Sequence, residues 1–204
     1  MSRYRGPVTK LSRRLGVVLF TNGESKNKAF NKKNYKPGEH GQKRFSQTSE
    51  YSRQLFEKQK ARFMYCISEK QSRKYYDLAS KSDEITGIKY LQLLEQRLDN
   101  VLFRAGLAMT RPQARQIVSH GLVKMNGKSV KTPSINVKVG DQFEIKDRSK
   151  DSKMFEDVRK AKYKSPKWLK SDLNSLKGEV TALPDKDDIE GIIEHQLITE
   201  FYSK

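Results

Sequence analysis

Basic side chains stand among glycine and aromatic residues near the start of the sequence, in a pattern suited to contacting nucleic acid. The first cluster consists of Arg3, Tyr4, Arg5, Lys10, Arg13 and Arg14, and the second, around a Pro-Gly-Glu-His-Gly turn, of Lys36, His40, Lys43 and Arg44. Arginine forks bind phosphate oxygens, aromatic rings stack on unpaired bases, and glycine allows close approach of the backbone. We therefore expect both clusters to bind RNA. The alternative is a disordered tail that only keeps the chain soluble.

A third group of polar residues, most of them cations, is predicted to lie on one side of a small folded unit. Its members are Arg97, Arg104, Arg111, Arg115, His120, Lys124, Asn126 and Lys128. The four arginines fall one or two turns apart on two predicted helices, so each pair shares a helix face. The other residues lie around a predicted hairpin. We expect this convergence to mark an RNA contact, whereas the alternative is a solvated basic surface without a ligand. Further RNA contacts are expected on two earlier helices, at Arg53, Lys58, Arg62 and Arg73.

The elements that would position these residues follow from cap, turn and periodicity signals. Residues 1–50 are punctuated by Gly-Pro, Asn-Gly and Pro-Gly pairs and are expected to be irregular. Helices are predicted over 49–62, over 68–79 behind a Ser68 capping box, over 88–105 with Gly106 as a left-handed cap, and from Thr110 to about Ser119. The Asn126-Gly127 pair predicts a hairpin with a type I′ turn. Alternation over 135–145 and a charged helical stretch over 147–164 complete an α+β pattern.

The charge of the chain points to a polyanionic partner. The 204 residues include 42 Lys and Arg against 24 Asp and Glu, which gives a formal net charge of +18. Residues 1–75 hold nineteen basic and five acidic side chains, whereas residues 172–204 hold three and eight. This asymmetry favours a phosphate-facing side and a protein-facing side. No apolar run is long enough to span a membrane, and neither a secretory leader nor a membrane partner is expected.

Catalytic chemistry has little support in the sequence. The three histidines, His40, His120 and His195, lie in different segments, and the single Cys66 can form neither an internal disulfide nor a zinc cage. The acidic run around Asp187 is expected to be a solvated turn rather than a metal site. Phosphate-loop, zinc-protease and nucleophile-elbow motifs are not found. We therefore expect no enzyme activity, no cofactor and no bound metal.

Five segments, in order along the whole chain, resemble the family of bacterial-type small ribosomal subunit protein four. They are Ser2-Arg3-Tyr4-Arg5-Gly6-Pro7 with Lys10-Leu11-Ser12-Arg13-Arg14, then Pro37-Gly38-Glu39-His40-Gly41-Gln42-Lys43-Arg44, Arg97-Leu98-Asp99-Asn100-Val101, Ala114-Arg115-Gln116-Ile117-Val118-Ser119-His120-Gly121, and the C-terminal Glu194-His195-Gln196-Leu197-Ile198 with Glu200-Phe201-Tyr202-Ser203-Lys204. Any one of them could mislead, because the helix-turn-hairpin module recurs in other RNA-binding proteins. Together they are specific.

The resemblance implies a fold and a function. It implies a mostly helical first domain with an irregular basic arm, interrupted by an inserted helix-turn-hairpin RNA-binding domain. On this basis we expect an arm over 1–45, a first domain over 46–92 completed by 182–204, and a second domain over 93–181. The family's proteins are primary binders of small-subunit rRNA at a junction in its 5′ domain, and they start assembly of the subunit body. They also lie near the mRNA entry channel and contact small-subunit protein five, here through Glu200, Phe201 and Tyr202, an interface that affects decoding accuracy.

The sequence departs from the family in ways that affect these expectations. Some family members hold zinc through four N-terminal cysteines, but Thr9 and Ser12 stand at the early positions here. Zinc is therefore not expected. The later loop around residues 26–31 also has no cysteine, and it is expected to be ordered by RNA. Two rivals remain: an RNA-modifying enzyme, which would need a separate catalytic domain, and an RNA chaperone or stalled-ribosome factor. A ribosome in a bacterial cytoplasm and one in an organelle both fit the sequence.

Overall fold

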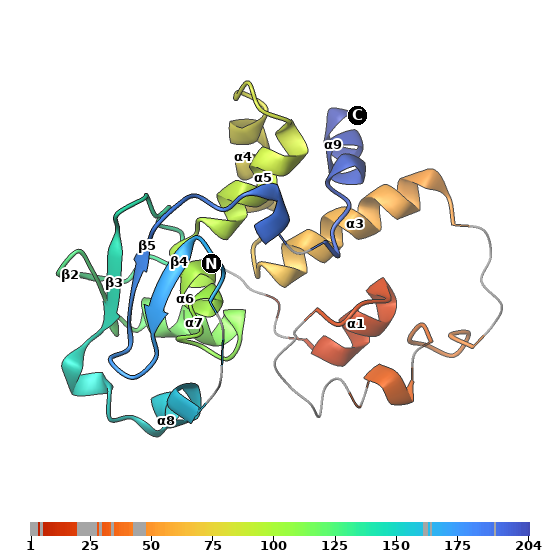
Figure 1. Ribbon diagram of the computed structural model, residues 1–204. Helices are drawn as coiled ribbons and strands as arrows, with labels where there is room; N and C mark the ends of the chain where they lie inside the picture. The colour runs from red at the N-terminus through yellow and green to blue at the C-terminus, as the bar shows by residue number, and fades with distance from the viewer. Residues whose placement is uncertain are drawn as a thin grey trace. The chain divides into compact units, whose positions relative to one another are not determined.

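The chain forms two compact units, which we describe separately (Figure 1). The computed structural model describes residues 4, 6–19, 28, 30–33, 35–42, 48–160, 163, 165–189 and 191–204. Unit 1 comprises residues 1–87 and 191–204, and unit 2 comprises residues 88–190. The predicted boundaries near residues 92 and 182 stay a prediction, because a compact unit need not coincide with a domain that folds alone. In the described part of the chain, the helices are all too short or too polar to cross a membrane.

Unit 1 is helical. It contains α1 (Val8–Leu15), α3 (Glu50–Met64), α4 (Glu69–Ala79) and α9 (His195–Ser203), and α5 (Thr86–Glu95) begins in it. The hydroxyl of Ser49 accepts a hydrogen bond from the backbone N–H of Ser52, and that of Ser68 from Gln71, so both predicted helix starts are confirmed. The expectation of an irregular start is wrong over α1, which Gly16 ends with a φ of 70°.

The C-terminal helix α9 completes the core of unit 1. Its Tyr202 ring lies 4.7 Å from the ring of Tyr76 on α4, and its Ile198 is fully buried. Gly87 allows the start of α5 to approach α9 closely, because a Cβ there would lie 2.8 Å from the His195 carbonyl oxygen. The C-terminal helix α9 and the helices that precede unit 2 in the sequence therefore share one core.

Unit 2 packs helices against an antiparallel sheet. Its elements are α6 (Leu98–Arg104), α7 (Arg111–Ser119), β1 (Val123–Met125), β2 (Lys128–Val130), β3 (Gln142–Ile145), the 3-10 turn η1 (Asp147–Ser149), α8 (Lys153–Lys160), β4 (Leu169–Asp172), β5 (Lys177–Val180) and the 3-10 turn η2 (Lys186–Asp188). The strand order is β2-β1-β3-β5-β4, with Val123 opposite Ile145. These two residues join Leu98, Val101 and other buried side chains of α6 and α7 in one core. The predicted α+β class is confirmed.

Local signals in unit 2 predicted the short elements well and the long helices less well. Gly106 has a φ of 77°, the Thr110 hydroxyl caps α7, and Asn126 and Gly127 have positive φ, as a type I′ turn requires. The predicted continuous helix over 88–105 is wrong, because Arg97 is extended and forms a β-bridge with Asn136. The predicted helix over 147–164 is also wrong in length, since η1 and the shorter α8 take its place.

Candidate nucleic-acid interface

A buried carboxylate, Asp99, holds two of the arginines predicted to bind RNA. Arg97 donates to it from Nε at 3.0 Å and from Nη2 at 2.7 Å, and Arg115 donates from Nη1 at 2.9 Å. Asp99 also accepts from the backbone N–H of Asn100 at 3.0 Å. The side chain of Arg97 is fully buried and that of Asp99 is 6% exposed. Charge-assisted, bidentate bonds of this kind fix the geometry of both partners.

A second buried carboxylate, Glu95 at the end of α5, holds the other two arginines. Arg104 donates to it at 2.9 and 2.7 Å, and the Asn100 side chain donates at 2.6 Å. The guanidinium of Arg111 lies 4.0 Å from Glu95 and donates to the Asn100 carbonyl oxygen at 2.7 Å. Its carbon also lies 4.5 Å from the centroid of the Phe103 ring. The two carboxylates and Asn100 thus tie together the end of α5, α6 and α7.

The alternative of a solvated basic surface therefore does not describe these arginines. Arg97, Arg111 and Arg115 are 0%, 6% and 9% exposed, because Glu95 and Asp99 draw them into the unit. Their first role is structural, so neutralising them would disturb the fold before it reported on RNA. RNA contact at these positions stays a prediction. The roles of Glu95 and Asp99 were not predicted from the sequence. The short spacing of an arginine, Arg97, and a carboxylate, Asp99, was a signal that could have indicated an ion pair.

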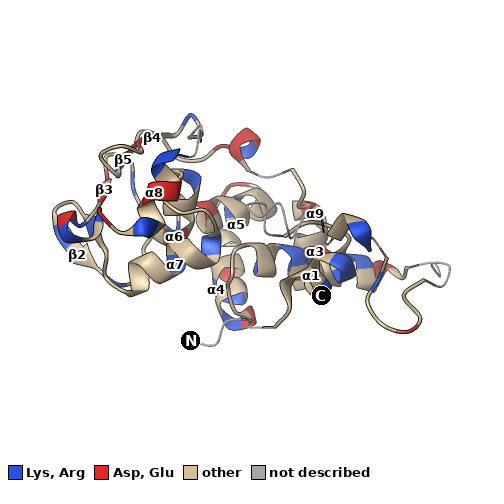
Figure 2. Ribbon diagram, turned by 90° about the horizontal axis from the view of Figure 1, so that it is seen from below, with Lys and Arg blue, Asp and Glu red and all other residues tan. Residues whose placement is uncertain are grey.

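Around the hairpin, the predicted residues divide into exposed and structural groups. Lys128, at the start of β2, and His120 are exposed. Figure 2 shows where Lys and Arg residues lie along the ribbon of each unit. Lys124 is half-buried and lies 3.6 Å from Glu144 and 3.7 Å from Asp147. The Asn126 side chain donates to Asp141 at 2.8 Å and accepts from the backbone N–H of Gln142 at 2.9 Å. Asn126 therefore fixes the turn that presents Lys128.

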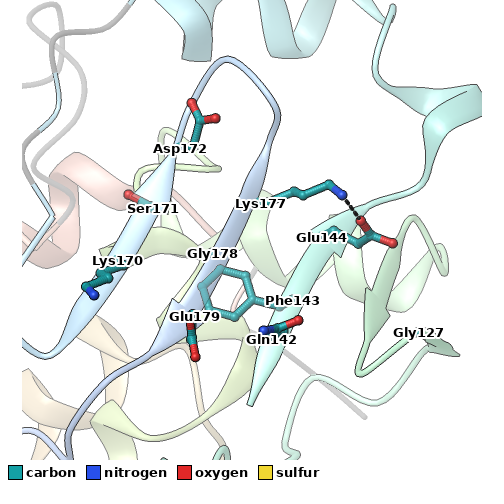
Figure 3. A pocket seen from close by; sticks show the side chains of 10 residues that line it. All are labelled: Gly127, Gln142, Phe143, Glu144, Lys170, Ser171, Asp172, Lys177, Gly178 and Glu179. Atoms are coloured by element: carbon teal, nitrogen blue, oxygen red, sulfur yellow. Dashed lines mark ion pairs between the residues drawn. The ribbon is translucent and has the colours of Figure 1, made fainter. Parts of the chain in front are cut away.

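One side of the sheet is hollowed and lined in part by charged residues. The hollow of about 590 Å³ lies over β3, β4 and β5 (Figure 3). Lys177 lies 3.0 Å from Glu144, and this bond lowers the pKa of the Glu144 carboxyl and raises the pKa of the Lys177 amine. Facing Lys177 on β4, Asp172 accepts hydrogen bonds from Ser175 and Asn174 in its own turn. The Lys177–Glu144 pair and the turn around Asp172 thus engage three of the charged side chains that line the hollow. The described residues also contain no group of His, Cys, Asp and Glu side chains able to hold a metal ion.

In the N-terminal arm, Arg13 binds the backbone at the start of the second basic cluster. It projects from α1, and its Nε donates to the Tyr35 carbonyl oxygen at 3.0 Å and its Nη2 to that of Lys36 at 3.4 Å. Its guanidinium also lies 4.7 Å from the Tyr35 ring centroid. The turn that follows is tight, because a Cβ at Gly41 would lie 1.8 Å from the Lys36 carbonyl oxygen. Arg13 and Gly41 therefore shape a turn that exposes Lys36 and His40.

The remaining predicted residues of the arm differ in exposure and in description. Lys10 and Arg14 are exposed on α1, and Tyr4 is 46% exposed. Four of the predicted contacts, Arg3, Arg5, Lys43 and Arg44, lie outside the described residues. The expectation that RNA orders this arm stays a prediction, although Arg13 already holds part of it.

On α3 and α4, ion pairs link most of the predicted RNA contacts to acidic neighbours. Arg53 lies 3.3 Å from Glu50 and Arg73 3.8 Å from Asp77, both at the surface. Lys58 and Arg62 instead share Glu69, at 2.9 and 3.3 Å. Burial raises the pKa of the Glu69 carboxyl, but the hydrogen bond and charge of Lys58, the Tyr202 hydroxyl and Arg62 together lower it below the ordinary value of 4.5.

The predicted protein-contact residues lie on α9. Glu200 accepts a hydrogen bond from the Gln54 side chain at 3.0 Å, and the ring of Phe201 lies 4.4 Å from the Lys58 amine. The Tyr202 hydroxyl lies 2.9 Å from the Ser72 hydroxyl and donates to Glu69 at 3.1 Å. Tyr202 is therefore a buried anchor, whereas Glu200 and Phe201 are half-buried.

Comparison with known proteins gives this arrangement a context. Residues 3–95 match the model of the ribosomal protein S4/S9 N-terminal domain, and residues 96–143 match that of the S4 domain. The chain is 46% identical over 209 residues to the small ribosomal subunit protein uS4 of Caldicellulosiruptor saccharolyticus, with 100% of each chain covered. It is 44% identical over 208 residues to that of Desulfitobacterium hafniense and 42% identical over 210 residues to that of Thermus thermophilus, again with 100% of each chain covered.

The chain belongs to the uS4 family of small ribosomal subunit proteins. The resemblance found in the sequence is thereby confirmed. The uS4 family consists of ribosomal proteins rather than enzymes, which confirms the expectation of no enzyme activity. The S4 domain match covers α6, α7, β1 and β2. Asp99 and its partners Arg97 and Arg115 therefore lie within the S4 domain. Glu95 is the last residue of the N-terminal match, so the network joins the two matched regions.

Proposed function

We propose that this uS4 family member is a structural constituent of the small ribosomal subunit that binds small-subunit rRNA directly, at a junction in the 5′ domain. The observation that carries the proposal is the 42–46% identity, over whole chains, to proteins named small ribosomal subunit protein uS4. The net charge of +18 supports a polyanionic partner.

The structure supports a division of labour between two kinds of basic residue. Buried arginines around Glu95 and Asp99 stiffen unit 2, and exposed cations are available to phosphates. Exposed basic candidates in the described part of the chain are Lys10, Arg14, Lys36, His40, Arg53, Arg73, His120 and Lys128. Lysine and arginine side chains neutralise phosphates and release counterions, which gives affinity with little sequence choice. Specificity comes from the shape of the folded junction, because the deep groove of A-form RNA hides its base edges.

The proposal includes a role at the start of assembly. Each unit has its own core, so both present preformed surfaces to RNA before other proteins are added. A protein of this kind favours one arrangement of RNA helices and thereby nucleates the body of the subunit. The closest rival is a free RNA chaperone, which would bind RNA transiently and leave the assembled particle.

We further propose that α9 contacts protein five and that this contact influences decoding accuracy near the mRNA entry channel. Glu200 and Phe201 are half-buried and retain accessible surface, whereas Tyr202 holds α9 against α4. Substituting Glu200 should then change the misreading rate of ribosomes without releasing the chain from the particle. Loss of the chain from particles would instead show that Glu200 acts through the stability of unit 1.

The main experiment is reconstitution of the small subunit with this chain omitted or supplied. We expect omission to block formation of the body, and late addition to rescue it only after the RNA is refolded. The assembled chain should stay with the particle in a high-salt sucrose gradient. A chain that is dispensable for assembly and washes off in high salt would contradict the proposal and favour the chaperone.

A further inference from the structure

An exposed aromatic pair in unit 1 has the geometry of a stacking site. Tyr4 is 46% exposed, and its ring lies edge-on to that of Phe63, with centroids 5.4 Å apart and planes at 70°. Phe63 is half-buried near the C-terminal end of α3. The guanidinium carbon of Arg62 lies 4.5 Å from the centroid of the Phe63 ring. We refer to Tyr4, Phe63 and Arg62 as the Tyr4 platform.

Local contacts hold the Tyr4 platform in shape. The Tyr4 ring lies directly over Gly6, where an added Cβ would come within 2.5 Å of the phenol oxygen and 2.6 Å of the carbon that bears it. The Tyr4 hydroxyl reaches the Pro7 carbonyl oxygen at 3.5 Å. Arg62 is held by Glu69 at 3.3 Å. A ring that is placed in advance loses less conformational entropy when it meets a ligand.

The surroundings of the Tyr4 platform select a nucleic-acid occupant. Residues 1–75 hold nineteen basic and five acidic side chains, and Lys10 and Arg14 are exposed on α1 of the same unit. This charge attracts a polyanion and disfavours a basic protein surface. Among polyanions, nucleic acid also carries flat aromatic faces, which stack on tyrosine, phenylalanine and guanidinium planes. Bases inside a duplex have both faces covered, so the occupant must be unpaired.

We propose that the Tyr4 platform stacks one unpaired RNA base. The inference rests on the proposed function, because it assigns a contact within the RNA that the chain binds. It adds a contact to a base face, through the Tyr4 ring with Phe63 edge-on beside it, to contacts that are otherwise made to phosphates. Phe63 was not among the residues predicted from the sequence, because only the fold brings it to Tyr4.

The test separates stacking from charge by using two polyanions. The full chain is titrated with a short oligoadenylate and with inorganic polyphosphate of equal charge, which has no bases. We expect Tyr4→Leu to weaken oligoadenylate binding on the order of tenfold and to leave polyphosphate binding unchanged. Tyr4→Phe keeps the ring and should bind as the wild type does. Gly6→Ala should weaken oligoadenylate binding in the same direction, because its Cβ displaces the phenol ring.

Tyr51→Leu is the matched control. Tyr51 is also an exposed aromatic residue of unit 1, 57% exposed, but its ring lies against Phe201 on α9. We expect this substitution to leave both affinities unchanged. Equal losses for the two ligands in Tyr4→Leu, an unchanged oligoadenylate affinity, or an equal loss in Tyr51→Leu would each overturn the stacking site. Failure of the proposed function is a different result, namely that the wild-type chain does not prefer 5′-domain rRNA to an unrelated structured RNA.

Discussion

Asn in place of Asp99 should strongly destabilise unit 2, although the substitution changes one atom and leaves the surface intact. Asp99 accepts two bonds from Arg97 and one from Arg115, and these side chains are 0% and 11% exposed. An amide in its place removes the negative charge and points hydrogen-bond donors at donors. Two guanidinium groups are then left in the interior without that carboxylate. Removing one partner of a buried ion pair costs about 3–5 kcal/mol.

Urea unfolding followed by the fluorescence of Trp168 measures this cost directly. Trp168 is the one tryptophan of the sequence, it is 2% exposed, and it belongs to the core of unit 2. With a urea m-value of about 2 kcal/mol/M, a loss of about 4 kcal/mol lowers the unfolding midpoint by about 2 M. Because a domain is stable by only about 5–15 kcal/mol, the Asp99→Asn substitution removes between roughly a quarter and most of that margin.

Asp147→Asn is the control for this prediction. Asp147 lies in the same unit and pairs with Lys150 at 2.7 Å, but its side chain is 75% exposed. We expect its substitution to leave the unfolding midpoint unchanged, since water screens and replaces the pair. If Asp99→Asn lowers the midpoint no more than Asp147→Asn does, the buried network is not what holds α6 against α7, and the reasoning is refuted.

Two further predictions concern unit 1. Gly41→Ala should disrupt the basic turn and weaken rRNA binding, because its Cβ would lie 1.8 Å from the Lys36 carbonyl oxygen. Gly191→Ala is the control and should leave the affinity unchanged, because no atom lies within 4 Å of its added Cβ. Equal affinities of the two variants in a filter-binding assay would contradict this prediction. Lys58, the Tyr202 hydroxyl and Arg62 outweigh burial and lower the pKa of the Glu69 carboxyl in the folded state. The ionised Glu69 carboxylate therefore stabilises the fold above about pH 4.5, and this stabilisation is lost as the pH falls through the folded-state pKa. Thermal unfolding of Glu69→Gln should accordingly show a lower midpoint at neutral pH and a smaller fall in acid than the wild type, and parallel curves would refute the assignment.

Features encoded by neighbouring residues were predictable from the sequence. Ser49, Ser68 and Thr110 cap helices because their hydroxyl oxygens accept from backbone groups three residues on. Asn126 and Gly127 form the hairpin turn because both tolerate positive φ. The family was also accessible, since its motifs are short and ordered along the chain.

Features that depend on distant partners were not predictable. The apolar stripe over 88–105 is continuous in sequence, yet the backbone N–H of Leu98 donates to the Ile135 carbonyl oxygen and that of Val137 to Gln96, which breaks the helix. Periodicity also identifies a helix face without saying what covers it. It placed Arg111 and Arg115 on one face, and only the fold shows that Asn100 and Asp99 meet them there. Charge alone therefore overstated how many of the predicted residues are exposed.

The most direct test of the central claim is a salt-titrated binding assay with two RNAs. The chain is titrated with the 5′ domain of small-subunit rRNA and with an unrelated structured RNA of equal length. We predict a steep fall of affinity with salt for both, from released counterions, and a large preference for the 5′ domain that persists as salt is raised. Equal affinities for the two RNAs at every salt concentration would contradict the claim and leave only a basic protein that binds RNA without selection.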